Sequence, residues 1–512
     1  MSQLVLMIAR VDDSDNLETL TELWRDSLPN VTPDAGEPQA YLDGLETTVM
    51  TVGWQAMRTL MIEQWRLTDQ DLVARFRQQH AEDVVLGDGY DPLKVVSRLG
   101  VVHLPRQVCY RSSTGQHVLP GNAGLPAHDG QVTTRGVQEW ACLLSQDLPF
   151  GTSQRLLGWL MRDPDAVSET QVRRWVVRHG AIIRQTEQAE IEALGERSDL
   201  SGLQAQLVPV GTPRHAAGWA TELNQAVDQA LAQPNPQPPP GVTNADWERV
   251  ITARQADRDA SAEQLRRLGP EVRPGEVIAS MDDVEVRRPE KRSFLDLRTG
   301  YVRTESGYRY LSGPAEQVLA QVGLLLMLCG GVTAKVTLLG DGAHWIIEFF
   351  KAKLSSWANA ELLLDWYHAQ KKCYRFTCLI CRGQKAKNEL LSVILRHLWR
   401  GKVDEAIAVL KAYYPQAKNT PKLDELIGYL EKKRPYIPNY QARRKQQQYI
   451  GSGPGEKAND LIVARRQKNK GMHWREASSD ALAALRTLVL NGGWDLYWQN
   501  HQVLPLAIPV QG

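Results

Sequence analysis

Two aspartates stand where a carboxylate could take part in chemistry. Asp341 follows the apolar run 336–339 and a glycine, and Asp365 follows the run 362–364. An amphipathic stretch comes next in each case, a pattern that predicts a buried strand followed directly by a helix. Ligand and metal sites of open α/β sheets gather at the carboxyl ends of such strands. The pair is therefore a candidate cation site, and the alternative is that each aspartate only caps the helix after it.

The elements around these aspartates predict an α/β sheet. The first strand is expected to end at Asp282 and Asp283, and turns are expected at 299–300 and 306–307. The order βββαβαβ is that of the ribonuclease-H-like fold, and it also fits an α/β sheet with one antiparallel edge. The expected elements are strands 277–281, 294–302 and 308–311, helix 314–328, strand 336–339, helix 345–354 and strand 361–364.

The ribonuclease-H-like fold places one carboxylate on the first strand, one after the fourth strand and one on the last helix. The matching residues here are Asp282, Asp341 and Glu456. Three carboxylates suit two Mg²⁺ ions, with Mn²⁺ able to substitute, because these hard cations take oxygen ligands. Such a pair activates a water or hydroxyl and stabilises the leaving oxygen in phosphoryl transfer. Two alternatives stay open: Asp283 as the first carboxylate, and Glu456 as an acid favoured in a first helical turn.

The stretch 277–475 resembles bacterial insertion-sequence transposases of the Mutator-like DDE superfamily. The likeness rests on Asp282, Gly340-Asp341-Gly342, Asp365-Trp366-Tyr367-His368, the glycine-rich approach to Glu456 and the closing stretch 465–474. It implies an enzyme that cuts transposon ends and joins the freed 3′-hydroxyl to target DNA with one pair of metal ions. Asp365 and His368 match that superfamily's element of an aspartate or cysteine, two residues and a histidine. His368 would position DNA or a carboxylate beside the site, and a structural histidine at a strand end is the alternative.

Positive charge is concentrated in one part of the chain. The net charge is +1, but the stretch 371–475 carries 24 Lys and Arg against 8 Asp and Glu. Few acids interleave there, which indicates a polyanionic partner rather than a merely solvated surface. We expect residues 371–445 to form an all-helical insertion, followed by a flexible glycine-rich stretch at 451–455. The residues expected to face double-stranded DNA are Arg443, Arg444, Lys445, Arg465, Arg466 and Lys468.

The amino-terminal half is expected to be mainly helical and to bind DNA. Ser168 and Gln171 fit a capping box at the start of a basic helix, and a shorter helix precedes it. This arrangement is typical of a helix-turn-helix that reads DNA through Arg173, Arg174 and Arg178, and an ordinary helical hairpin is the alternative. The expected domains are a helical region 1–89, a β-rich segment 90–133, a helix-turn-helix region 134–200, a proline-rich linker 201–245 and a catalytic domain 246–500.

Composition sets the broad class. The chain has 512 residues, 43% of them hydrophobic, and a mean hydropathy of −0.37, as expected for a soluble protein of several domains. A signal peptide and a membrane span are not expected, and six irregularly spaced cysteines favour a reducing cytoplasm, with association with the nucleoid. On DNA we expect a homodimer or higher oligomer. Two other classes stay open: a ribonuclease-H-like nuclease without strand transfer, and a domesticated sequence-specific DNA-binding protein with an inert site.

Overall fold

The computed structural model describes residues 38–126, 131–209, 270–290 and 293–510, together with five residues between 244 and 252. The chain divides into two compact units, Met1–Trp175 and Val176–Gly512, and each is described by itself. Most of the proline-rich linker expected at 201–245 lies outside the described residues, as does most of the stretch 246–269 at the start of the expected catalytic domain. Across the described ranges, no helix combines the length and the apolar character that crossing a membrane requires.

The first unit contains a long helix packed on a four-stranded sheet. Helix α3 (Pro38–Gln79) leads into strand β1, and the sheet has the order β3-β2-β1-β4. Trp65 of α3 packs on the sheet core and donates its indole N–H to the carbonyl of Pro105 at 2.7 Å. The β-rich segment expected from residue 90 therefore begins slightly earlier. The strands are β1 (Val84–Ser97), β2 (Gly100–Arg111), β3 (His117–Val118) and β4 (Gln131–Thr133).

Three helices follow: α4 (Arg135–Ser145), α5 (Phe150–Leu160) and α6 (Glu169–Gly195). The predicted capping box at the start of α6 is confirmed. The backbone N–H of Ser168 donates to Gln171 Oε1 at 2.8 Å, and the backbone N–H of Gln171 donates to Ser168 Oγ at 3.2 Å. The boundary between the two units falls within α6, after Trp175.

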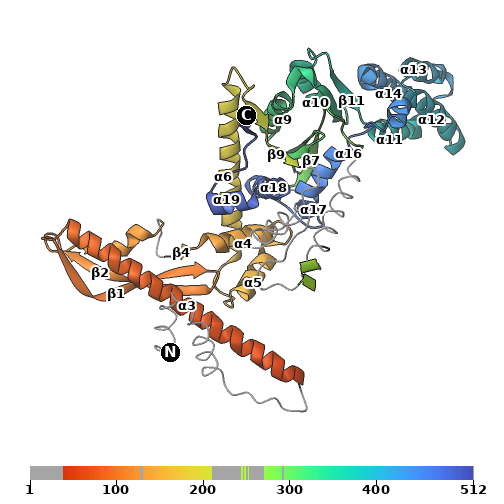
Figure 1. Ribbon diagram of the computed structural model, residues 1–512. Coiled ribbons are helices and arrows are strands. Elements are labelled where there is room, and N and C mark those ends of the chain that lie inside the picture. The colour runs from red at the N-terminus through yellow and green to blue at the C-terminus, as the bar shows by residue number, and fades with distance from the viewer. Residues whose placement is uncertain are drawn as a thin grey trace. The chain divides into compact units, whose positions relative to one another are not determined.

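The second unit is built on a mixed six-stranded sheet with the order β11-β10-β7-β8-β9-β6. Three of its strands, β7, β9 and β11, are labelled in Figure 1. Strands β7, β8 and β9 are antiparallel neighbours, while β10 and β11 continue the sheet parallel to β7. The predicted chain order of three strands, helix, strand, helix and strand is therefore present. The elements are β7 (Glu276–Arg287), β8 (Phe294–Arg303), β9 (Gly307–Gly313), α9 (Ala315–Leu328), β10 (Lys335–Gly340), α10 (His344–Phe349) and β11 (Ala360–Leu364).

Three details of this sheet differ from expectation. Strand β7 does not end at Asp282, because its pairing with β8 continues to Arg287. The turn expected at Thr299–Gly300 lies inside β8, where a Cβ on the glycine would stand 3.2 Å from the Val322 side chain of α9. Glycine thus allows close approach of the helix rather than a turn. The expected linker begins with two short strands, β5 (Leu203–Ala205) and β6 (Val208–Pro209), the second of which pairs with β9.

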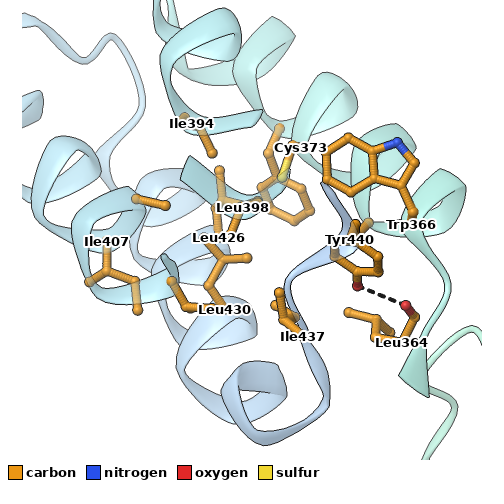
Figure 2. Close-up of a cluster of buried hydrophobic side chains, with 14 of the residues drawn as sticks. Leu364, Trp366, Cys373, Ile394, Leu398, Ile407, Leu426, Leu430, Ile437 and Tyr440 are labelled. Carbon is orange, nitrogen blue, oxygen red and sulfur yellow. Dashed lines mark hydrogen bonds between the residues drawn. The ribbon is translucent and has the colours of Figure 1, made fainter. Parts of the chain in front are cut away.

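The stretch between β11 and residue 445 is all helical, as predicted, and its helices share one hydrophobic core with residues of β7, β10 and β11. Figure 2 shows this core, in which Ile394, Leu398, Leu426 and Leu430 are almost completely buried. Figure 2 also shows Tyr440 at its margin, where the hydroxyl donates to the carbonyl of Leu364 at 2.7 Å. The helices are α11 (Trp366–Ile380), α12 (Gln384–Trp399), α13 (Val403–Ala412), α14 (Thr420–Lys433) and α15 (Tyr440–Lys445).

The chain then returns to the sheet through a helical run, which is followed by the longer helix α18, the short helix α19 and a final short strand. Helix α16 (Gly453–Asn459) continues through a π-helical turn, Asp460–Ala464, into the short α17 (Arg465–Gln467). Helix α18 (Glu476–Leu490) packs against α6, where a Cβ on Gly180 would stand 2.4 Å from Ala481. The last elements are α19 (Trp494–Asn500) and β12 (Ala507–Pro509), which pairs with β5.

The buried hydrogen bond of Tyr440 should contribute to stability. Tyr440→Phe leaves the Leu364 carbonyl without this donor, so we expect the free energy of unfolding in urea to fall by about 1–2 kcal/mol. Tyr374→Phe is the matched control, because this side chain on α11 is 49% exposed, and its unfolding should be unchanged. Equal effects of the two substitutions would contradict a role for the hydrogen bond.

Candidate active site

The parallel strands bring two of the predicted carboxylates together. Leu339 of β10 lies opposite Ser280 of β7, so the same register, continued by two residues, places Asp341 beside Asp282. Asp341 follows the carboxyl end of its strand, as predicted. Asp282 instead lies in the middle of β7, where the pairing with β8 continues past it and fixes the backbone beneath the carboxylate.

Asp365 is the most buried acid of the site, with 1% of its surface exposed. It caps α11, since the backbone N–H of His368 donates to Oδ1 at 2.8 Å, and it also belongs to the group of possible ligands described below. Its Oδ2 accepts from the backbone N–H and the hydroxyl of Ser452. Burial alone would raise the pKa of Asp365, but the hydrogen bonds from His368 and Ser452 outweigh it and lower the pKa. Asp365 is therefore a buried anion that ties segments together.

The glycine-rich stretch 451–455 is packed rather than flexible. Most of its residues are buried, and a Cβ on Gly455 would stand only 2.3 Å from Ser280 Oγ. A larger residue at this position would push α16 away from β7. The glycine thus lets the helix that carries Glu456 lie directly on the strand that carries Asp282.

Asp282 is held close to other negative charges. Asn459 of α16 donates from its amide Nδ2 to Asp282 Oδ2 at 2.7 Å, which fixes the carboxylate. Burial, together with the charges of Asp341 and Asp283, raises the pKa of Asp282 from 3.8 to about 6, although a backbone hydrogen bond and His368 act in the opposite direction. Holding carboxylates this close together costs free energy unless a cation lies between them. Buried acids with a strongly shifted pKa are typical of functional sites.

His368 lies between two carboxylates. Its Nδ1 is 3.6 Å from Asp365 Oδ1 and 3.8 Å from Glu456 Oε1, and within the described ranges this buried nitrogen has no hydrogen-bond partner. The Asp365 carboxylate is the largest cause that raises the pKa of His368; burial opposes it, while Asp341 and Glu456 add to it. Of the residues described, one group of three has ligand atoms within 4.8 Å of one another, namely Asp365, His368 and Glu456.

The residues present fit a divalent cation. The tight group around His368 is not the predicted set of Asp282, Asp341 and Glu456, and two of those acids lie outside it. The two sets share Glu456, and the charges of Asp282 and Asp341 both act on His368, so all five side chains belong to one electrostatic cluster. A metal ion held between them would relieve the repulsion of the neighbouring aspartates Asp282 and Asp341.

The helical insertion contributes a cation that the sequence did not single out. Lys433, the last residue of α14, donates from Nζ to the carbonyl of Gly342 at 2.5 Å, next to Asp341. Burial and the neighbouring lysines 432, 351 and 372 lower the pKa of Lys433, and the charge of Asp341 opposes them. In the sequence Lys433 is one of many lysines in the basic stretch; only the tertiary fold places it beside the acids. Asn459 was missed for the same reason.

Two of the predicted DNA-facing residues are structural. Arg443 is 12% exposed, pairs with Glu361 at 2.7 Å and donates to the carbonyl of Tyr449 at 2.9 Å. Arg466 is 5% exposed, and its guanidinium lies 4.6 Å from the ring centre of Trp474. Both side chains hold neighbouring segments together, and we remove them from the expected DNA-facing surface.

The other predicted cations are exposed. In α6 the alternation is regular: Val172, Trp175 and Val176 are buried and the arginines between and after them face outward. The residues that stay available to a polyanion are Arg173, Arg174, Arg178, Arg444, Lys445, Arg465 and Lys468.

No protein-family model matches this chain, and a search of curated proteins finds no match either. A function must therefore be inferred from the geometry of the site and from the resemblance of its motifs.

The raised pKa of Asp282 predicts a pH-dependent stability in metal-free buffer. The folded protein retains a proton here up to about pH 6, whereas the unfolded chain releases it near 3.8. The protonated Asp282 carboxyl therefore contributes fully to the stability of the folded protein below about pH 4, and this contribution is lost as the pH rises to about 6. Asp282→Asn cannot ionise. Its free energy of unfolding in urea should therefore rise relative to that of the wild type between about pH 4 and 6, by at most about 3 kcal/mol.

A change in the hydrogen bond from Asn459 shifts the stability of Asp282→Asn by the same amount at every pH. The prediction therefore concerns only how the stability difference from the wild type changes with pH. Asp296→Asn is the control, because this aspartate on the neighbouring strand β8 is exposed. A constant difference between Asp282→Asn and the wild type from pH 4 to 7 would contradict it.

Proposed function

We propose that this chain is a Mg²⁺-dependent DNA transposase with a ribonuclease-H-like catalytic domain. The observation that supports the proposal is the position of the acids on the sheet β11-β10-β7-β8-β9. Asp282 lies on its central strand, Asp341 follows the next parallel strand, and Glu456 comes from a helix packed on β7. This strand order, with β7 to β9 antiparallel and β10 and β11 parallel, is the order that the ribonuclease-H-like fold has.

In this proposal Asp282, Asp341 and Glu456 hold the metal ions. A bound pair of Mg²⁺ ions supplies an activated water or 3′-hydroxyl and stabilises the leaving oxygen. Asn459 holds Asp282 in place, and Asp365 fixes the start of α11 and the approach to Glu456. His368, with its ring between two carboxylates, positions Glu456 and offers a proton donor toward a DNA phosphate.

DNA reaches the site through two basic regions. The exposed arginines of α6, Arg173, Arg174 and Arg178, would read the transposon ends as the second helix of a helix-turn-helix. The connection between α5 and α6, residues 161–168, is longer than the usual tight turn of that motif. The cations of the insertion would bind the DNA backbone near the metals. The active form would be a homodimer or higher oligomer on DNA.

Purified protein should process DNA that carries the ends of its own element. With Mg²⁺ or Mn²⁺, we expect 3′-hydroxyl ends to appear and then to join to a target plasmid. Asp341→Asn should reduce both steps at least about 100-fold while leaving duplex binding intact, because it removes a charge from the metal site alone. Cleavage without joining would favour a nuclease, and binding without either reaction would favour a domesticated DNA-binding protein.

The corrected basic surface predicts a change in salt dependence. Each phosphate contact contributes about −0.9 to the slope of log affinity against log salt concentration. Arg444→Glu combined with Lys445→Glu should therefore weaken binding to all duplex DNA and flatten the slope by roughly 2, as measured by fluorescence anisotropy. The control is Arg75→Glu, an exposed arginine of α3 outside the proposed surface. An unchanged slope in the double variant would remove this surface from the DNA path.

A further inference from the structure

The first unit contains a cavity of about 920 Å³ that the proposed function does not use. Its walls come from α3, from α4, from α5 and from the turn after α5. Three of its side chains are tryptophans, Trp54, Trp140 and Trp159, and two are arginines, Arg155 and Arg162. The volume lies within the range of about 300–1,000 Å³ that is usual for ligand pockets.

One aromatic ring of this cavity is unusually open to solvent. Trp159 is 76% exposed, and on the same helix Leu156 and Leu160 are 36% and 37% exposed. By contrast, Trp54 is held in place, because its indole N–H donates to the carbonyl of Leu99 at 3.0 Å. A fixed ring on one wall and an exposed ring on another form a slot suited to a flat, apolar group.

Cations accompany these rings. Arg162 has a left-handed backbone, with φ +52°, and its guanidinium lies 5.8 Å from the ring centre of Trp54. Arg155 contacts the hydroxyl of Thr152 at 3.3 Å. In the described part of the chain neither arginine has a carboxylate partner, and no acid lines the cavity. An occupant with negative charge beside a flat ring would satisfy both groups.

We infer that this cavity binds unpaired nucleotides of a DNA strand, with bases stacked on the tryptophans and phosphates bound by Arg155 and Arg162. Every nucleobase offers a flat face, and aromatic side chains flanked by arginines are the usual platform for single-stranded nucleic acid. A second copy of the chain docked through this same patch would bury the apolar rim as well, but the two guanidinium groups would then face their own counterparts, because no acid lines the cavity. The inference rests on the proposal that the chain acts on DNA, and it adds a site for a strand that has left the duplex.

The test uses the full chain and a labelled 20-nucleotide oligo-dT, with binding measured by fluorescence anisotropy. Trp159→Ala should weaken binding roughly 5- to 100-fold, the loss of one stacked base, and Trp159→Phe should have a smaller effect. Because Trp159 is exposed, both variants should fold. An abasic strand of the same length should bind more weakly to the wild type and respond little to Trp159→Ala. Arg155→Ala should weaken binding of both strands, since each carries phosphates.

The controls separate this site from duplex binding. Tyr90→Ala removes another exposed aromatic ring of the first unit and should leave oligo-dT binding unchanged. Duplex DNA should bind Trp159→Ala and wild type equally. Unchanged oligo-dT binding by Trp159→Ala would overturn the inference. If Trp159→Ala also reduced self-association in sedimentation, the cavity would be assigned to a second copy of the chain instead. Loss of DNA cleavage activity in Asp341→Asn tests the proposed function separately, because that substitution does not touch the cavity.

Discussion

One buried carboxylate holds the candidate site together. Asp365 directly follows strand β11 and caps the start of α11 by accepting a hydrogen bond from the backbone N–H of His368. It also accepts two hydrogen bonds from Ser452, which lies just before α16. A buried anion is stable only when hydrogen-bond donors surround it, so these three segments must meet wherever Asp365 is ionised. The positions of His368 and Glu456 follow from that requirement. Asp365 therefore acts mainly on the arrangement of the other acids.

The site combines acids that repel one another with cations from another part of the chain. The carboxylates of Asp282 and Asp341 are kept close by the pairing of strands β7 and β10. Lys433 reaches the same loop from the insertion and supplies a nearby positive charge. The charge balance of the candidate site therefore depends on two parts of the second unit, the sheet and the helical insertion.

The sequence predicted the order of the sheet elements well, because apolar runs and amphipathic stretches are local signals, although the turn expected at Thr299–Gly300 lies inside β8. It also placed Asp341 and Asp365 at strand ends. It misplaced the end of β7, since the pairing that extends this strand past Asp282 depends on residues far along the chain. Arg443 and Arg466 were indistinguishable from exposed cations, because their partners Glu361 and Trp474 are fixed by tertiary packing. Lys433 and Asn459 gave no local signal at all.

The helical insertion leaves and rejoins the sheet at one point. The backbone N–H of Trp366 donates to the carbonyl of Ile450 at 3.0 Å, and Asp365 binds Ser452, 87 residues later in the chain. During synthesis the strands that carry Asp282 and Asp341 are therefore complete long before Glu456 leaves the ribosome, by about 6 to 23 seconds at usual rates of elongation. In the nascent chain the acidic site stays incomplete until the insertion has been synthesised. Glu456 can therefore join Asp282 and Asp341 only after the basic residues of the insertion are present.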